Sequence, residues 1–235
     1  MINRVMYDLA GANVNLRFSP YCWRSRMALL HKNLQFETVP WRFTDKEAIA
    51  FSGQGLVPVL VDKDQVVHDS WAIADYLERT YPDAPSLFGG DKGQSLTRFI
   101  NEFTHSVVIP GIARLIVSDI VKILDERDRA YFRETREKHF GQPLEEVTSN
   151  RDVEVVGFRK SLDPARRVLT RQPYLGGSTP LYADYILFGA FQWARCASPF
   201  ELLTEEDPIV PWRDRLLDAF DGHARHARPP FLRTA

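Results

Sequence analysis

Cysteine is scarce in this sequence, with two residues in 235, Cys22 and Cys196. Two cysteines cannot cross-link a chain of this length into a disulfide-rich fold, and we expect both to be reduced. Long apolar runs are also missing, because the longest, residues 107–117, is interrupted by proline, glycine and arginine. A transmembrane helix needs about 20 nearly unbroken apolar residues, and the first residues lack the apolar core of a signal peptide. We therefore expect a cytoplasmic protein without a membrane span.

The sequence has no excess of charge of either sign. Lys and Arg number 30 against 31 Asp and Glu, which gives a net charge of −1 and no general attraction for nucleic acid. The motifs that bind nucleotides or metals are missing too, and neither His105 nor His139 belongs to a metal-ligating pattern. We expect no nucleic acid, no nucleotide and no metal. The hydrophobic share of 44% and the charged share of 26% are typical of a folded protein.

Strand and helix signals alternate along the first 82 residues. We predict strands at residues 5–9, 36–39, 57–61 and 65–67, and helices at residues 21–33, 46–51 and 70–81. A strand, a helix and a second strand in close succession indicate a right-handed parallel crossover, and the last two strands form a hairpin. Residues 1–82 are therefore predicted to be one α/β unit, a four-stranded mixed sheet with helices on both faces.

The remainder of the chain has a helical pattern. Residues 83–94 are predicted to be a linker, because proline and glycine concentrate there, and residues 95–235 to be all-α. Within this part we expect a solvated charged helix at 125–138, irregular chain at 141–157, an amphipathic helix at 158–171, a buried central helix at 183–197, a last helix at 212–220, and a tail from His223 that frays or lies on the surface.

A first candidate site lies between the first strand and the first helix. Ser19 is placed to cap that helix, with Pro20 at the first helical position. The positive end of a helix also stabilises an anion and lowers the pKa of a thiol brought to it. A cap alone would explain the motif, so the structural and the chemical interpretation both remain open.

Two further candidates follow. Pro58 begins a strand, and a cis bond there would leave the Val57 N–H and C=O free to pair with an extended peptide, although an ordinary edge proline is the alternative. Asp69 and Ser70 begin a helix, where free N–H groups favour a carboxylate and Asp69 could pair with an ammonium group. Together they would suit the head of an α-amino acid, but a simple helix cap is the competing interpretation.

The order and spacing of these motifs resemble the cytosolic glutathione transferases over essentially the whole chain. More narrowly, the chain is similar to the bacterial β-etherase branch and its fungal relatives. The segments that carry the resemblance are Ser19-Pro20-Tyr21-Cys22-Trp23-Arg24, Val57-Pro58, Asp69-Ser70-Trp71, the insert from Arg136 to Val147, Tyr174-Leu175-Gly176-Gly177 and Ala183-Asp184-Tyr185. The resemblance implies a thioredoxin-like glutathione-binding domain, then an all-α domain that forms the acceptor site.

The resemblance also implies roles for individual residues. Ser19 would donate its hydroxyl to the thiolate of glutathione, the co-substrate, whose sulfur is the nucleophile. The other implied glutathione contacts are Val57 and Pro58 for the cysteinyl part, Asp69 and Ser70 for the γ-glutamyl head, and Arg42, Lys46 or Gln54 for the glycine carboxylate. The implied acceptor wall consists of Asn13, Tyr21, Phe103, Val107 and Arg114, with Arg114 near a developing phenolate.

Three functions follow from the resemblance. The first is a transferase, usually a homodimer, that attacks a small apolar electrophile and in the β-etherase case releases a phenolate. The second is a carrier that kept the fold and lost turnover. The third is a thiol reductase, which is disfavoured because serine rather than cysteine stands at position 19 and Cys22 lies one turn inside the helix. The chain departs from many relatives at Leu181, where a polar residue would cap the helix that contains Asp184.

Overall fold

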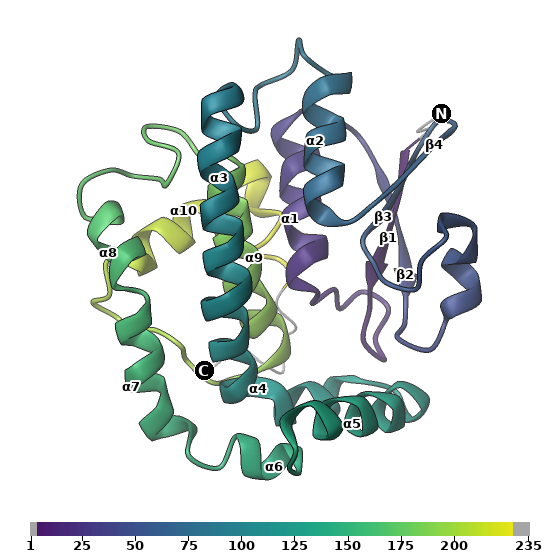
Figure 1. The fold of residues 1–235 in the computed structure, drawn as a ribbon, viewed down its shortest axis with the longest axis vertical. Coiled ribbons are helices and arrows are strands. Elements are labelled where there is room, and N and C mark those ends of the chain that lie inside the picture. Colours follow the sequence, from purple (N-terminus) through teal and green to yellow (C-terminus); the bar gives the residue numbers. More distant parts are fainter. Residues whose placement is uncertain (1–3, 228–235) are drawn as a thin grey trace.

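The computed structural model describes residues 4–227, and its N-terminal part is built on one sheet (Figure 1). The strands are β1 (Arg4–Leu9), β2 (Glu37–Trp41), β3 (Val59–Asp62) and β4 (Gln65–His68). Their order in the sheet is β2-β1-β3-β4, with β1 parallel to β2 and antiparallel to β3, and β3 antiparallel to β4. The predicted four-stranded mixed sheet of a thioredoxin-like domain is confirmed.

Helices cover both faces of this sheet. On one face lie α1 (Pro20–His31) and α2 (Ser70–Thr80), which separate the sheet from the helical part (Figure 1). On the other lies the 3₁₀ helix η1 (Lys46–Ser52), where the Phe51 ring packs against Tyr7 at 5.4 Å between centroids. Strand β3 begins two residues later than predicted, so Val57 and Pro58 stay outside the sheet.

The C-terminal part is helical, as predicted. Its elements are α3 (Asp91–Phe103), the π-helical turn η2 (Thr104–Val108), α4 (Ile109–Ile123), α5 (Glu126–Phe140), α6 (Leu144–Val147), α7 (Arg151–Ser161), α8 (Asp163–Leu169), α9 (Tyr182–Ala197) and α10 (Ile209–Gly222). Helix α9 is the predicted central helix, and all of its side chains except Trp193 and Arg195 are buried.

A close helix crossing joins the two parts. Helix α1 lies between the sheet and α9, and a Cβ added at Gly189 would come within 2.4 Å of the Pro20 carbonyl oxygen. Only glycine allows this approach, because any larger residue would push the first turn of α1 away. The start of α1, where the Ser19 motif lies, is therefore held against the core of the helical part.

The start of α9 is held by a buried carboxylate. Asp184 accepts hydrogen bonds from the Leu175 N–H (2.7 Å), the Gly176 N–H (2.9 Å), the Leu181 N–H (3.0 Å) and the Trp212 indole N–H (2.8 Å). Leu181 has no polar side-chain atom to complete a capping box. The prediction that Asp184 still binds loop amides is confirmed.

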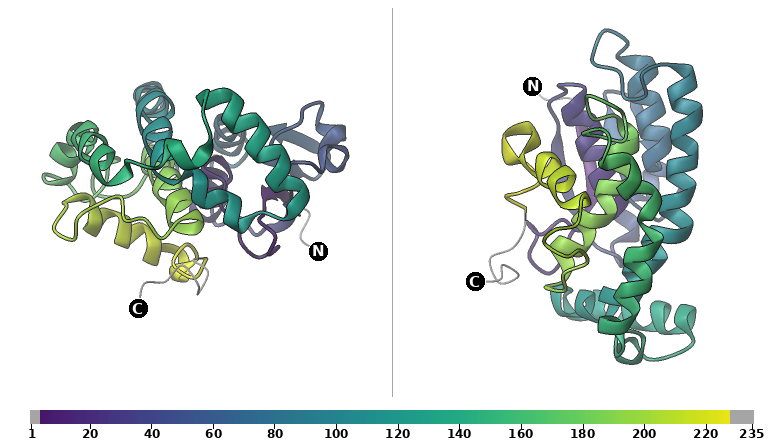
Figure 2. Two further views of the ribbon diagram at one scale, coloured as in Figure 1. Left: turned by 90° about the horizontal axis from the view of Figure 1, so that it is seen from below. Right: turned by 90° about the vertical axis from the view of Figure 1, so that its left-hand side faces the viewer.

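Helix α5 lies beneath the sheet domain in the view of Figure 1, and the left-hand view of Figure 2 shows it from below. Most of its surface is exposed, as its mixed charge predicted, but the buried Asp128 is an exception. Its carboxylate accepts the main-chain N–H groups of Phe43 and Thr44, both at 2.9 Å, in the loop after β2. Asp128 therefore ties α5 to the sheet domain.

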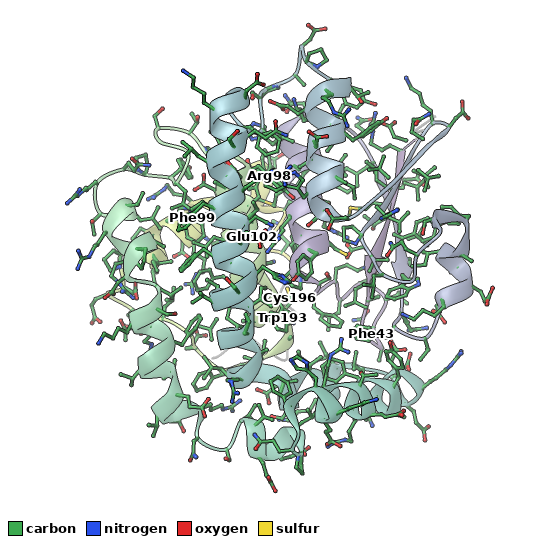
Figure 3. All side chains as sticks on the ribbon, in the orientation of Figure 1. Phe43, Arg98, Phe99, Glu102, Trp193 and Cys196 are labelled. Atoms are coloured by element: carbon green, nitrogen blue, oxygen red, sulfur yellow. The ribbon has the colours of Figure 1, made fainter. Side chains whose placement is uncertain are left out.

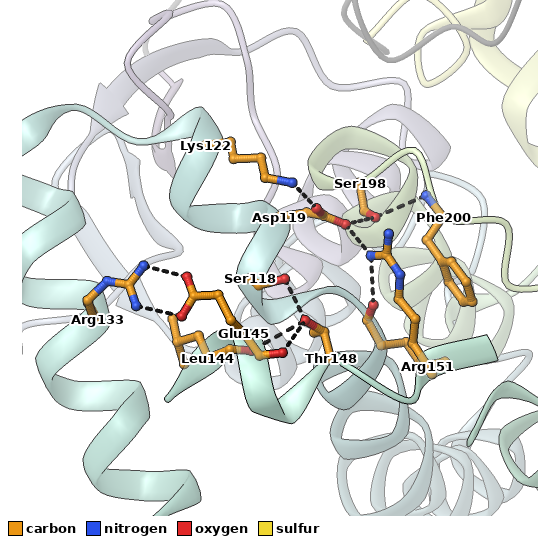
Figure 4. A network of polar contacts seen from close by, with 11 residues as sticks. Ser118, Asp119, Lys122, Arg133, Leu144, Glu145, Thr148, Arg151, Ser198 and Phe200 are labelled. Atoms are coloured by element: carbon orange, nitrogen blue, oxygen red, sulfur yellow. Dashed lines mark hydrogen bonds and ion pairs between the residues drawn. The ribbon is translucent and has the colours of Figure 1, made fainter. Parts of the chain in front are cut away.

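A second buried carboxylate joins the far ends of several helices (Figure 4). Asp119 of α4 contacts Lys122, Arg151 of α7 and Ser198 after α9, each at 2.7 Å. Burial opposes ionisation of Asp119, but these three hydrogen bonds outweigh it and hold its pKa below the usual range. Beside it, Ser118 contacts Thr148, and Arg133 forms a two-pronged pair with Glu145.

Several boundaries differ from the sequence predictions. Residues 141–157 are not irregular, because α6 and most of α7 lie there. Gly141 and Pro143 do end one helix and begin the next, but Val153 and Val156 face solvent while Val155 and Phe158 are buried, which obscured the periodicity. Helix α10 begins earlier than predicted, at Ile209.

The predicted fraying tail is wrong for its first residues. His223 packs its ring against Trp23, with centroids 5.9 Å apart, and Ala224 is fully buried. His226 is exposed, as predicted, and residues 228–235 of this segment lie outside the described residues. Among the helices of residues 4–227, none has the length and apolar character needed to cross a membrane.

Candidate functional site

A cavity of about 590 Å³ opens between the sheet domain and helix α3. Its walls are formed by Tyr21, Arg24, Gln54, Leu56, Val57, Pro58, His68, Asp69, Ser70, Trp71, Arg98, Asn101, Glu102 and His105. These residues come from the first helix, the loop before β3, the end of β4, the start of α2, and α3 with its π-helical turn. The fold thus brings together six of the predicted site residues, Tyr21, Gln54, Val57, Pro58, Asp69 and Ser70.

Asp69 is the N-cap of α2. One of its carboxylate oxygens accepts the N–H groups of Trp71 (2.8 Å) and Ala72 (3.0 Å). Its φ of 72° is in the left-handed region, which costs free energy for any residue other than glycine. Asp69 therefore caps α2, as the structural interpretation predicted. The second oxygen of the Asp69 carboxylate makes neither of these bonds and lies at the exposed edge of the cavity.

Ser70 has a main-chain N–H group that the Asp69 cap does not satisfy. Asp69 satisfies the N–H groups of Trp71 and Ala72 with its side chain and that of Ile73 with its carbonyl. Within residues 4–227 the Ser70 N–H has no partner, and the residue is only 3% exposed. A free N–H at the positive end of α2 beside a serine hydroxyl is suited to bind a carboxylate.

The main chain of Val57 forms the opposite side of this pocket. The Val57–Pro58 bond is cis, as the sequence allowed. Because β3 begins at Val59, the Val57 N–H and C=O take no part in the ladder and have no main-chain partner among the described residues. Gln54 lies next to them, with its side-chain amide folded onto the main chain of Leu56.

Ser19 lies at the start of α1, two residues before Tyr21, and is not itself among the residues that line the cavity. Its hydroxyl oxygen accepts the Cys22 N–H at 3.2 Å, and the residue is 4% exposed. Because that bond uses an oxygen lone pair, the hydroxyl proton remains available for donation. The structure therefore supports the cap and is compatible with a second, chemical role.

Arg24 was not among the predicted site residues. Its side chain lies in the cavity wall and is 1% exposed, with one nitrogen donating to the Asn101 amide oxygen at 3.0 Å. The Nε atom and the other terminal nitrogen are buried and have no hydrogen-bond partner. Burial lowers the pKa of Arg24, the direction expected for a cation that lacks a carboxylate partner. The arrangement can accept an anion.

The helical wall of the cavity is polar. It consists of Arg98, Asn101, Glu102 and His105, and the Arg98 guanidinium lies 4.4 Å from the ring centroid of Trp71. Figure 3 shows Arg98 on the side of α3 toward α2, and Phe99 on the opposite side. These four polar residues are spaced by three, one and three positions, which places them on one face of a helix. The polar face could therefore have been recognised from the sequence.

Models of two protein domains match the chain. The model described as "Glutathione S-transferase, C-terminal domain" matches residues 95–215, and the corresponding N-terminal domain model matches residues 18–80. The chain belongs to the glutathione S-transferase family. The family uses glutathione as its co-substrate.

Individual relatives extend this result. The chain is 29% identical over 140 residues to a glutathione S-transferase-like protein, ustS, of Aspergillus flavus, covering 54% of this chain and 49% of that protein. The chain thus spans about half the length of the first curated relatives it matches. Among solved structures, glutathione transferase GSTFuA3 of Phanerochaete chrysosporium has a TM-score of 0.81 at 25% identity, covering 91% of this chain and 95% of that one.

A second solved structure was obtained with a ligand. The glutathione S-transferase CsGST63524 of Ceriporiopsis subvermispora, in complex with glutathione, has a TM-score of 0.77 at 22% identity, covering 95% of this chain and 94% of that one. At this identity the likeness shows the fold alone. The fold of this chain is therefore that of a glutathione transferase.

Several residues expected from the family lie away from the cavity. Arg42 pairs with Asp125 at 2.9 Å, and Lys46 donates to the Gly55 carbonyl at 2.7 Å. Neither lines the cavity, so of the three candidates for the glycine carboxylate only Gln54 does.

Most residues predicted for the acceptor wall do not line the cavity either. None of Asn13, Phe103, Val107 and Arg114 lines the cavity, and Arg114 is exposed. The residues predicted for the helical side of this wall lie at the end of α3, in η2 and in α4, whereas the face of α3 and η2 that meets the cavity is polar. Only Tyr21 of the predicted acceptor residues lines it, and the acceptor roles of the other four remain predictions without a position that supports them.

Cys22 is fully buried, and burial raises the pKa of its thiol well above the usual value. A buried protonated thiol is a poor nucleophile, which agrees with the expectation that Cys22 is a packing residue. Among the described residues there is no cluster of three or more His, Cys, Asp and Glu side chains that could hold a metal ion.

Proposed function

We propose that the protein is a glutathione S-transferase that binds glutathione in the cavity at the start of α2 and activates its thiol for attack on a small electrophile. The observation that carries the proposal is the arrangement of three features in one cavity. These are the Ser70 N–H, the unpaired nitrogens of Arg24, and the unpaired main chain of Val57. They match a carboxylate and an extended peptide, the two parts of the glutathione backbone.

The γ-glutamyl head would bind between α2 and Arg24. Its carboxylate would accept from the Ser70 N–H and hydroxyl and from the free nitrogens of Arg24, which would then no longer be a buried charge without a counter-ion. The ammonium group would pair with the second oxygen of Asp69. This pair contributes less free energy than the first, because Asp69 is exposed to water.

The cysteinyl part would pair with Val57 through two main-chain hydrogen bonds, as a short added strand. This pairing would direct the thiol toward the start of α1. There the Ser19 hydroxyl, which already accepts the Cys22 N–H, would donate to the sulfur and stabilise the thiolate. Gln54 would turn from Leu56 toward the glycine carboxylate.

Binding of the second substrate beside the thiolate would supply the rest of the catalysis by proximity. The finer activity we propose is cleavage of a β-aryl ether, in which the thiolate attacks the carbon next to a ketone and a phenolate leaves. It would serve the breakdown or detoxification of aromatic compounds. A homodimer and a cytoplasmic location, without a nucleic-acid or membrane partner, remain predictions, as does the division into residues 1–82, 83–94 and 95–235.

Asp69→Asn is expected to weaken glutathione binding by about 2- to 5-fold while leaving the melting temperature of the free protein unchanged. Asparagine caps a helix as well as aspartate does, but it cannot attract the ammonium group, and an exposed pair contributes up to about 1 kcal/mol. Calorimetric titration with glutathione measures the affinity, and thermal melts measure stability.

Two further variants complete this test. Ser70→Ala should also weaken binding, with less than additive effects in the double variant, because both residues hold one group. Asp64→Asn, in the exposed turn between β3 and β4, is the control. Normal affinity in both Asp69→Asn and Ser70→Ala would mean that the start of α2 is only a helix cap.

Ser19→Ala is expected to lower turnover by roughly 10- to 150-fold and to change glutathione affinity much less. A hydrogen bond to a charged group contributes about 1.5–3 kcal/mol, and the sulfur gains charge on activation. Steady-state rates with an aryl halide, measured from pH 6 to 8, test this. Unchanged rates over that range would remove Ser19 from the mechanism.

The alternative function is a carrier for glutathione conjugates or apolar ligands. The same cavity would then bind glutathione without any turnover of an aryl halide or a β-aryl ether. The Ser19 hydroxyl at the start of α1, which a carrier would not need, favours the enzyme over the carrier.

A further inference from the structure

The mouth of the cavity contains a contact that glutathione binding does not explain. The hydroxyl of Tyr21, in the first turn of α1, lies 3.0 Å from Nδ1 of His105 in the π-helical turn η2. Both side chains line the cavity, one from each domain. The widened turn of a π-helix is uncommon and is frequently found at functional sites.

The Tyr21 hydroxyl carries its proton. Burial raises the pKa of Tyr21, and although the Arg24 guanidinium 4.6 Å from its ring centroid acts in the opposite sense, burial outweighs it. In the arrangement that we use here, Nδ1 of His105 is the acceptor of this hydrogen bond and the Tyr21 hydroxyl is the donor. The cavity therefore presents a protonated hydroxyl two residues after Ser19, held in place by an acceptor that it can exchange for another oxygen.

We infer that Tyr21, positioned by His105, donates a proton to an oxygen atom of the second substrate as the glutathione sulfur attacks. The inference rests on the proposed function and adds a substrate class to it. The second substrate carries an oxygen that becomes negative in the reaction, the phenolic oxygen of an aryl ether in the proposed activity. The other polar side chains of this wall are poorer proton donors, because the Asn101 amide N–H already donates to Glu102 and the guanidinium of Arg98 does not release its proton.

The step balances without any further reagent. The glutathione thiol first loses its proton to water. Its sulfur then forms a bond to carbon, the carbon–oxygen bond of the ether breaks, and the electron pair goes to the phenolic oxygen. That oxygen takes the proton of Tyr21, and the Tyr21 phenolate regains a proton from water, after which its hydroxyl returns to His105. The products are a thioether and a phenol.

A substrate whose leaving group needs no proton distinguishes proton donation by Tyr21 from an effect of the substitution on every reaction of the enzyme. Chloride leaves an aryl chloride without protonation, whereas a phenolate is a poorer leaving group that a proton donor assists. Tyr21→Phe should therefore lower kcat for a series of β-aryloxy ketones by about 10²-fold, most for the least acidic phenols, with KM little changed. The loss of kcat with the aryl chloride should be about ten times smaller.

Variants of His105 test its positioning role. His105→Ala should also lower kcat, by a smaller factor than Tyr21→Phe. His105→Asn keeps a hydrogen-bond acceptor near the position of Nδ1, so it should lower kcat less than His105→Ala does. Tyr7→Phe is the control for loss of a phenolic hydroxyl, because Tyr7 packs on Phe51 outside the cavity. It should leave all rates unchanged.

The outcomes distinguish this inference from the proposed function. Equal losses for ether and chloride, or no loss in Tyr21→Phe, would overturn the role of Tyr21. A wild-type protein that turns over the aryl chloride but no ether would overturn the substrate class and leave the transferase function standing. A wild-type protein that neither binds glutathione nor turns over either substrate would overturn both.

Discussion

Asp184→Ala is expected to remove about 3–5 kcal/mol from the free energy of unfolding. The wild-type carboxylate is fully buried and accepts four N–H groups, three from the loop before α9 and one from Trp212. Without it these donors stay buried and unpaired, and each such group costs about 1–3 kcal/mol before the loop relaxes.

Urea unfolding followed by tryptophan fluorescence measures this loss. Asp83→Ala, an exposed aspartate in the segment between α2 and α3, is the matched control and should stay within about 0.5 kcal/mol of wild type. A loss below 1 kcal/mol in Asp184→Ala would mean that the four bonds are not the main support of the loop.

Arg24→Met is expected to weaken glutathione binding by roughly 30- to 1000-fold without lowering the stability of the free protein. Removing one partner of a buried, hydrogen-bonded charge pair costs about 2–4 kcal/mol of binding free energy. In the free protein the guanidinium is buried with two nitrogens unpaired, and replacing such a charge with an apolar side chain of similar length is often neutral or stabilising.

Calorimetric titration and urea unfolding of the same variant test both halves of this prediction. Arg24→Lys keeps the charge and loses the planar donor pair, so its affinity should lie between those of wild type and Arg24→Met. A variant that loses stability and binds glutathione normally would show that Arg24 holds the two domains together through Asn101 and has no ligand.

The sequence predicted the sheet domain well because its signals are local. Each strand is a short apolar run bounded by turn residues, and the capping motifs at Ser19 and Asp69 mark helix starts that the structure confirms. The cis bond before Pro58 was recognised as an option from the position of that proline. These features depend on residues that are close together in the chain.

The cavity wall was predicted less well because it depends on distant contacts. Arg24 matters through Asn101, 77 residues away, and nothing near Arg24 in the sequence marks it as unpaired. Phe103, Val107 and Arg114 were predicted for the helical side of the wall, yet the residues that line it there are Arg98, Asn101, Glu102 and His105. Helical spacing defines the faces of a helix, but only the packed structure shows which face meets the cavity.

Asp128 illustrates the same limit. It lies in a helix whose mixed charge indicated a solvated surface. The structure buries it against the main chain of Phe43 and Thr44, some 85 residues earlier. A single acidic residue in a charged segment carries no sign of such a contact, because the partner is a main-chain N–H, which every residue except proline has.

A crystal structure of the protein with glutathione would test the central claim most directly. The account predicts the γ-glutamyl carboxylate on the Ser70 N–H and Arg24, the cysteinyl main chain paired with Val57, and the sulfur within hydrogen-bond distance of the Ser19 hydroxyl. Ordered glutathione at another place in the molecule, or a sulfur that contacts no group of the α1 start, would contradict it.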